Sequence, residues 1–330
     1  MALSWADVLW SPLWAVAAFF LGLRLQQRWL WRPRSCPVQL KGRTAIVTGA
    51  NSGIGKFIAL DFARRGARVI LACRNQRAGA AAAAEIRAAT QNPDVHVRPL
   101  DTSCLDSVRT FASTIIQEEP ALHILVNNAG ASAITKDGLE LSFATNHLGP
   151  FLLTNLLLDL LKSSAPARIV NVSSSNHIRG EVDFSHFKGE NLTYKMDNVY
   201  NNTKLHQIMC TNELARKLQG SGVTANSVHP GYVMTSMLRH YSFALRLVFK
   251  LVGVFFFKFS SGCLAVAHVP LHAEQGAVSV IYCAVSEETE GITGKYFDSD
   301  CALVNPAPLA RDPALGAKGF DISMRLTSKY

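Results

Sequence analysis

The sequence lacks the cysteine pattern of a disulfide framework or a zinc site. Its seven cysteines are an odd number, and none of them forms a Cys-x-x-Cys pair. They are widely spaced, at Cys36, Cys73, Cys104, Cys210, Cys263, Cys283 and Cys301. This spacing predicts reduced thiols that mostly serve packing, and no group of residues has the spacing of metal ligands.

A basic stripe is also absent, although the formal net charge is +9. Much of the positive charge lies near the N-terminus, at Arg24, Arg28, Arg32, Arg34, Lys41 and Arg43, opposed there only by Asp7. These residues flank an apolar segment and do not run along a folded domain. The distribution therefore argues against nucleic-acid binding.

The apolar segment runs from about Leu3 to Leu23 and carries one charge, Asp7, which makes it close to the ~20 apolar residues that cross a bilayer. Its positive charges follow the apolar run, whereas those of a signal peptide precede it. We therefore expect an uncleaved membrane anchor at residues 1–24 and a basic linker at 25–39. The positive-inside rule places the following domain in the cytosol. Secretion after cleavage is the alternative.

Short apolar runs and helical stretches alternate after the linker. The expected strands are Thr44–Thr48, Arg68–Ala72, His96–Leu100, Ile124–Asn127, Arg168–Ser173, Thr224–His229 and Tyr296–Phe297. The expected helices are Gly55–Arg65, Gln76–Thr90, Leu105–Glu118, Gly138–Lys162, Tyr200–Gln219 and Glu274–Val285. The alternation predicts one α/β domain at residues 40–305 with a doubly wound parallel sheet of the Rossmann type, followed by a tail at 306–330.

One stretch departs from this alternation. Residues Phe243 to Phe259 are apolar, but Arg246, Lys250 and Lys258 interrupt them. A buried helix pair is one interpretation, and a segment on the membrane interface beside the substrate site is the other. We expect residues 243–273 to form a substrate lid near the membrane.

A glycine-rich turn, from Thr48 to Gly55, follows the first expected strand and opens the first helix. Glycine lets backbone amides approach a pyrophosphate, and the N-terminus of a helix supplies positive potential there. In this context the turn predicts a dinucleotide site, with a plain tight turn as the alternative.

Tyr200 and Lys204 lie four residues apart on an expected helix and therefore share one of its faces. A phenol beside a fixed cation is a usable proton donor. Without the surrounding motifs, two such residues are more often a solvated pair on a helix.

These motifs stand in the order found in the short-chain dehydrogenase/reductases, and the chain resembles that family over about residues 40 to 305. The matching motifs are Thr48-Gly-x-x-x-Gly-x-Gly55, Asn127-Asn128-Ala129-Gly130, Asn146, Ser174, Tyr200-x-x-x-Lys204 and Pro230-Gly231-x-Val233-x-Thr235. Stretches such as Asn146–Thr154 and Ser227–Gly231 are most similar to the membrane-bound retinol dehydrogenase branch.

The resemblance implies a role for each catalytic residue. Tyr200 would be the general acid or base, and Lys204 would lower the pKa of its phenol and hold ribose hydroxyls. Ser174 would orient the substrate oxygen, and Asn146 would position a water that links Lys204 to solvent. Because Ser173 and Ser175 adjoin Ser174, a slip of one residue is the alternative.

The resemblance also implies a set of cofactor-binding residues: Thr48, Gly49, Asn51, Ser52, Gly53, Ile54, Gly55, Arg74, Asp101, Asn128, Ala129, Gly130, Tyr200, Lys204, Pro230, Gly231, Val233 and Thr235. The second expected strand leads into Cys73-Arg74-Asn75, without an acidic residue. A guanidinium suits a 2′-phosphate, and Lys56 adds a second cation just after the glycine turn, so the cofactor is expected to be NADP(H).

We therefore expect an NADP(H)-dependent oxidoreductase that interconverts a lipophilic alcohol and its aldehyde or ketone, with retinol and retinal as the first substrate pair. It would be anchored in the endoplasmic reticulum membrane, and a homodimer is a candidate assembly. Steroids or other lipid carbonyls are alternative substrates. The tail after Ala310 and the stretch from Ser260 to Ala273 depart from the branch, so a catalytically weak, cofactor-binding interaction protein is the alternative function.

Overall fold

The computed structural model describes residues 36–130, 141–182, 184, 196–231 and 273–328. The expected anchor at 1–24, most of the linker at 25–39 and all but the last residue of the lid at 243–273 lie outside the described residues. Among the helices that are described, none combines the length and the apolar character needed to cross a bilayer.

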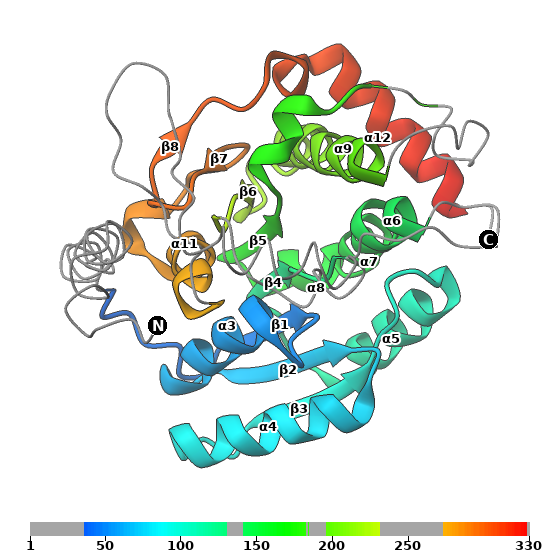
Figure 1. Cartoon of the computed structure of the whole chain (residues 1–330). Helices are drawn as coiled ribbons and strands as arrows, with labels where there is room; N and C mark the ends of the chain where they lie inside the picture. The colour runs from blue at the N-terminus through cyan, green and yellow to red at the C-terminus, as the bar shows by residue number, and fades with distance from the viewer. Residues whose placement is uncertain (1–35, 131–140, 183, 185–195, 232–272, 329–330) are drawn as a thin grey trace, which may run out of the picture.

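An eight-stranded sheet forms the centre of the domain, in the order β3-β2-β1-β4-β5-β6-β7-β8. The strands are β1 Thr44–Thr48, β2 Arg68–Cys73, β3 Val95–Pro99, β4 Ile124–Asn127, β5 Ala167–Val172, β6 Val223–Val228, β7 Tyr296–Phe297 and β8 Leu303–Val304. Every pair is parallel except β7 with β8. The order reverses between β1 and β4, which is where such sheets bind ligands. The predicted doubly wound sheet is confirmed (Figure 1).

Helices cover both faces of this sheet (Figure 1). The longer ones are α3 Gly53–Arg64, α4 Gln76–Thr90, α5 Leu105–Glu118, α7 Gly149–Leu156, α8 Leu158–Ser163, α9 Met196–Lys217, α11 Ala273–Val285 and α12 Pro313–Ser328. Helices α3, α4 and α11 share one apolar core, and α5, α7, α8 and α9 share the other. Successive residues of a strand face opposite sides, so Val47 of β1 enters the first core and Ile46 the second. Both faces are buried, which explains the continuous apolar strands.

The described part of the single helix expected at Gly138–Lys162 is helical apart from Leu157, but it is not one regular α-helix. The chain forms a short α6 at Leu141–Phe143, a π-helix at Ala144–Leu148, then α7 and α8. Pro150 lies at the start of α7, where its missing N–H does no harm. Gly149, the residue before Pro150, lies against the loop after β3. A Cβ on Gly149 would lie 1.9 Å from the Thr102 carbonyl oxygen. Position 149 therefore has room only for glycine.

The residues expected only as a tail include a helix. Helix α12 packs along α9 (Figure 1), and the 3₁₀ turn at Pro308–Arg311 precedes it. The short strand β8 was also missed. The seven strands predicted from the sequence agree with β1 to β7 to within one residue at each end.

Arg68 at the start of β2 ties this strand to the end of α5. Its Nε donates to Glu119 Oε2 at 2.7 Å and its Nη2 to Oε1 at 2.8 Å, and it also pairs with Asp94. The Glu119 side chain is only 1% exposed. The hydrogen bonding of Arg68 to the Glu119 carboxylate is the main cause that raises the pKa of Arg68 above its ordinary value. The buried Glu119 carboxylate thus accepts two hydrogen bonds from the Arg68 guanidinium.

We expect Glu119→Gln to lower the free energy of unfolding by about 2 kcal/mol, because it removes one charge from a partly buried, hydrogen-bonded pair. Urea unfolding would measure it. The adjacent Glu118 offers a matched control, since its side chain is 44% exposed and pairs with Arg98 on the surface. Glu118→Gln should change stability by less than about 1 kcal/mol. Equal effects of the two substitutions would contradict the expectation.

Candidate active site

The glycine turn brings α3 close to the loop after β4. Gly49 and Gly53 adopt positive φ angles of 67° and 57°, which favour glycine. Gly55 has no room for a side chain, because a Cβ there would lie 2.5 Å from Asn128 Nδ2 and 2.6 Å from Gly49 O. The turn leaves its backbone open at the start of a helix, as a pyrophosphate site requires.

Thr48 and Asn128 join the loops that follow β1 and β4. The strand order reverses between these two strands, and this place is called the switch point of the sheet. Thr48 Oγ1 accepts hydrogen bonds from the backbone N–H groups of Asn128 and Ala129, each at 2.9 Å. In return, Asn128 Nδ2 donates to the Thr48 carbonyl oxygen at 2.9 Å. The Asn128-Ala129-Gly130 loop and the glycine turn therefore form one unit at the carboxyl edge of the sheet. The turn residues Asn51, Ser52 and Ile54 complete it, with Ser52 as the N-cap of α3.

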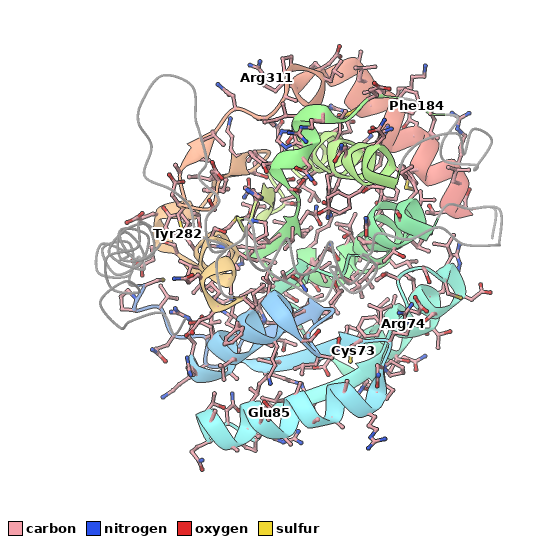
Figure 2. The ribbon with its side chains drawn as sticks, viewed as in Figure 1. Cys73, Arg74, Glu85, Phe184, Tyr282 and Arg311 are labelled. Carbon is pink, nitrogen blue, oxygen red and sulfur yellow. The ribbon has the colours of Figure 1, made fainter. Side chains whose placement is uncertain are left out.

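Arg74 follows β2 at the same edge and is 73% exposed (Figure 2). Its Nη1 lies 3.8 Å from Asp101 Oδ2, and Asp101 is held by Ser103, whose backbone N–H donates at 3.0 Å and whose hydroxyl donates at 2.6 Å. Lys56, the second cation expected near the site, pairs with Glu85 of α4. The case for a phosphate contact therefore rests on Arg74.

Lys204 is the buried cation of the site. Its side chain is 4% exposed, and its Nζ donates to the Val172 carbonyl oxygen at 2.7 Å and contacts Gln207 Oε1 at 3.4 Å. The same Nζ lies 5.7 Å from the centroid of the Tyr200 ring. Burial lowers the pKa of Lys204 to about 8. The two residues thus lie together on α9, as their spacing predicts.

Ser173 and Ser174, which follow β5, make different contacts. Ser173 is buried, and its hydroxyl donates to the Lys204 carbonyl oxygen at 3.2 Å, which fixes α9 to the strand. Ser174 is half-buried and accepts a hydrogen bond from the Asn176 N–H at 3.2 Å, as the N-cap of the 3₁₀ helix Ser175–Arg179. That contact leaves the hydroxyl proton of Ser174 unused. Of the two hydroxyls, Ser174 is the better placed to donate to a substrate.

Asn146 lies in the π-helix, fully buried. Its Nδ2 donates to Thr203 Oγ1 at 3.3 Å, and Thr203 in turn donates to the Tyr200 carbonyl oxygen at 2.7 Å. A Cβ on Gly130 would lie 3.5 Å from Asn146 Oδ1, so the cofactor loop adjoins this residue. Sequence reasoning missed both the π-helix and the bridging role of Thr203. Short π-helical turns are common at functional sites.

Pro230 and Gly231 follow β6 at the same edge, and Gly231 has a φ of 84°. Val233 and Thr235 lie outside the described residues. A cavity of about 570 Å³ lies elsewhere, at the amino ends of the strands, where Arg43, His123 and Arg168 line it. It does not belong to the motif-bearing edge.

The fold and the carboxyl-edge site define a nucleotide-dependent α/β oxidoreductase, and comparison with known proteins identifies its class. The family model for short chain dehydrogenases matches residues 43–244. The chain belongs to the short-chain dehydrogenase/reductase family, whose members act on CH–OH groups with a nicotinamide cofactor. Its similarity to the retinol dehydrogenases places it in the retinol dehydrogenase-like branch.

The similarity to these relatives extends over most of each chain. Retinol dehydrogenase 12 of Mus musculus is 44% identical over 293 residues, which are 88% of this chain and 87% of that protein. Retinol dehydrogenase 14 of Mus musculus is 41% identical over 329 residues, covering 95% of this chain and 93% of that protein.

Solved structures agree on the fold. The crystal structure of an uncharacterised protein from Mycobacterium paratuberculosis has a TM-score of 0.69 and 31% identity, and covers 90% of this chain and 97% of that one. The Pseudomonas aeruginosa RhlG/NADP active-site complex has a TM-score of 0.60 and 26% identity, and covers 79% of this chain and 95% of that one.

The buried Lys204 should leave a signature in stability against pH. Its pKa is about 8 in the folded protein and about 10.4 when unfolded. Between these values the unfolded chain binds more protons, so the free energy of unfolding rises with pH in that window. Lys204→Met should remove this rise and stabilise the protein at pH 7 by up to about 3 kcal/mol.

Urea unfolding at pH 7 and pH 9.5 would measure this effect. Lys217 lies on the same helix with 43% of its side chain exposed, so Lys217→Met is the matched control and should keep the rise. A Lys204→Met protein that is less stable than the wild type at pH 7 would contradict the expectation.

Proposed function

We propose that this protein is an NADP(H)-dependent oxidoreductase that interconverts retinol and retinal, with Tyr200 as the proton donor and acceptor. The observation that supports this most is the buried Lys204 ammonium beside the Tyr200 ring. It occurs in a chain that is 44% identical to a retinol dehydrogenase.

The residues of the chain can supply the proton chemistry. A phenol has an unperturbed pKa of about 10. For Tyr200 to donate and remove a proton near pH 7, its pKa must fall by about 3, which corresponds to roughly 4 kcal/mol of preferential stabilisation of the phenolate. The nearby Lys204 ammonium supplies part of it. Ser174 would donate its hydroxyl proton to the substrate oxygen and hold it beside the Tyr200 hydroxyl. A water held by Asn146 would then exchange protons between Lys204 and solvent.

The cofactor supplies or takes the hydride at the substrate carbon when it is bound. Its pyrophosphate would lie against the turn from Gly49 to Gly55, where Gly55 is packed against Asn128 and no side chain would obstruct it. Arg74 would pair with a 2′-phosphate, since its guanidinium is exposed at the end of β2. The Pseudomonas aeruginosa RhlG structure is a complex with NADP, which supports the same choice here.

We further propose that residues 1–24 anchor the protein in the endoplasmic reticulum membrane, with the catalytic domain in the cytosol. The single charge in the apolar run from Leu3 to Leu23 and the basic residues that follow it support this arrangement. A membrane location would also suit a substrate as apolar as retinal.

Reduction of all-trans-retinal by the full-length protein in detergent with NADPH tests the main proposal. We expect retinol as the product and a loss of about 100-fold or more in kcat for Tyr200→Phe. A steroid ketone and a long-chain aldehyde should be slower than retinal. Tyr200→Phe with wild-type activity would overturn the mechanism, and a preferred steroid would overturn the substrate.

Two neighbouring serines provide an internal control for this assay. Ser174→Ala should lower kcat by about 100-fold, because the substrate oxygen loses a donor. Ser173→Ala should mainly lower stability, by about 1 kcal/mol, because it loses the bond to the Lys204 carbonyl. The reverse pattern would assign the catalytic hydroxyl to Ser173.

Arg74→Ala tests the cofactor preference. We expect KM for NADPH to rise by about 10-fold or more, since a charged hydrogen-bond partner of the phosphate is lost, while KM for NADH changes little. Arg64→Ala, an exposed arginine at the end of α3, is the matched control and should change neither value. Equal increases for NADPH and NADH in Arg74→Ala would contradict 2′-phosphate recognition.

A further inference from the structure

The π-helix that carries Asn146 has a second attachment, on the side of α12. His147 is the next residue, 2% exposed, and its Nε2 lies 2.9 Å from Ser323 Oγ on α12. Ser323 Oγ also lies 2.8 Å from the Gly319 carbonyl oxygen of its own helix. A hydroxyl has one proton, so Ser323 donates to Gly319 and accepts from His147 Nε2–H.

The ring of His147 is suited to this contact because it is neutral. Burial is the main cause that holds the pKa of His147 well below its ordinary value, and the charges of His206 and Lys204 act in the same direction. A neutral imidazole carries one N–H, and the contact with Ser323 assigns it to Nε2.

Helix α12 is itself fixed by contacts with three other helices. The Phe320 ring lies edge-on to Phe151 of α7 with centroids 4.9 Å apart, and Lys217 Nζ of α9 lies 5.1 Å from the Phe320 centroid. From α5, Arg109 Nη2 donates to the Thr327 carbonyl oxygen near the end of α12. These contacts give the Ser323 oxygen a fixed position.

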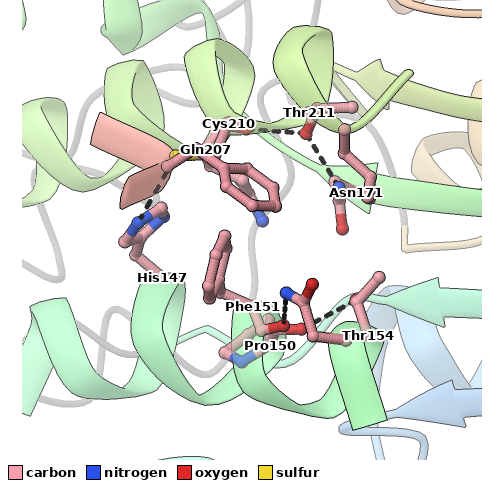
Figure 3. A pocket seen from close by; sticks show the side chains of 11 residues that line it. His147, Pro150, Phe151, Thr154, Asn171, Gln207, Cys210 and Thr211 are labelled. Carbon is pink, nitrogen blue, oxygen red and sulfur yellow. Dashed lines mark hydrogen bonds between the residues drawn. The ribbon is translucent and has the colours of Figure 1, made fainter. Parts of the chain in front are cut away.

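Only a small cavity separates α7, α9 and α12 at this place (Figure 3). Its volume is about 20 Å³, which is room for about one water, and His147 and Cys210 are among its lining residues. The helices are therefore in close contact around His147, and little free space would let the ring turn away from Ser323.

We propose that Ser323 is a positioning residue: its hydrogen bond to His147 lets α12 hold the π-helix in the orientation that presents Asn146 to the catalytic helix. This inference rests on the proposed function for Asn146. The π-helix is then held from two sides, since Asn146 donates to Thr203 of α9 and His147 donates to Ser323 of α12. Neighbouring residues of a helix point in different directions, so both attachments can form at once.

Ser323→Ala deletes this hydrogen bond and leaves the rest of α12 in place. Thr327→Ala is the matched control: Thr327 lies one turn further on the same helix, is also buried, and donates only to the helix backbone, to Ser323 O at 2.9 Å and Met324 O at 3.2 Å. Retinal reduction should show kcat lowered about tenfold in Ser323→Ala, with KM nearly unchanged and with Thr327→Ala like the wild type.

A double-mutant cycle separates positioning from general destabilisation. If Ser323 acts through Asn146, Ser323→Ala should lower kcat further by less than about twofold in an Asn146→Ala background. Additive losses, or equal losses of kcat in Ser323→Ala and Thr327→Ala, would overturn the inference.

Hydrogen exchange tests the attachment without any turnover. The backbone amides of residues 144–148 should exchange faster in Ser323→Ala than in the wild type and in Thr327→Ala, because the π-helix has lost its hydrogen bond to α12. Unchanged exchange there would overturn the inference even in an enzyme that reduces retinal. A protein that reduces no substrate but shows the faster exchange would refute the proposed function and keep the attachment.

Discussion

The arrangement of this site depends on one buried ammonium. Lys204 is 4% exposed, and its Nζ donates to the carbonyl oxygen of Val172, the last residue of β5. Removing a charge from water costs several kcal/mol unless polar partners replace the water. The end of β5 must therefore lie against α9 at this residue, and the Ser173 hydroxyl, which donates to the Lys204 carbonyl, holds the same two elements together. The position of Tyr200 above the ammonium follows from this contact, because both side chains belong to α9.

The second requirement is that two loops meet at the switch point of the sheet. Thr48 ends β1 and Asn128 follows β4, and these strands are paired neighbours. Thr48 and Asn128 exchange two hydrogen bonds, and Thr48 accepts a third from the Ala129 N–H. The Asn128 side chain held in this way lies so close to Gly55 that a Cβ there would have no space. A nucleotide site forms here because neighbouring parallel strands end at one edge and the connecting loops are bound to each other. Lys204 reaches that edge from α9, and Ser174 from the end of β5.

The sequence predicts the parts of this structure that depend on local pattern. Strands β1 and β4 and helices α4 and α5 agree with their expected bounds, since an apolar run or a helical repeat marks each of them. The need for glycine at position 149 could not be predicted, because it depends on a carbonyl oxygen from the loop after β3. The contact of Ser173 with the Lys204 carbonyl oxygen depends on where α9 lies. Each of these features is decided by a residue distant in sequence, which no local pattern reveals.

Helix α9 needs packing partners on more than one of its faces. Its middle is buried although it is largely polar: Asn201, Asn202, Thr203, Lys204, His206, Gln207 and Thr211 are all less than 9% exposed. No amphipathic stripe marks such a helix, and polar side chains stay buried only where other groups hydrogen-bond to them. The sheet provides such partners on one side, through Val172 and Asn171. On another side α12 excludes water, through the packing of Phe320 beside Lys217 and Phe151. A Cβ on Gly319 of α12 would lie 3.7 Å from Cys210 Sγ and 3.9 Å from His206 Nδ1. Helix α12 therefore covers the face of α9 that carries His206, while the sheet covers the face that carries Lys204, and the polar middle of α9 is buried between the two.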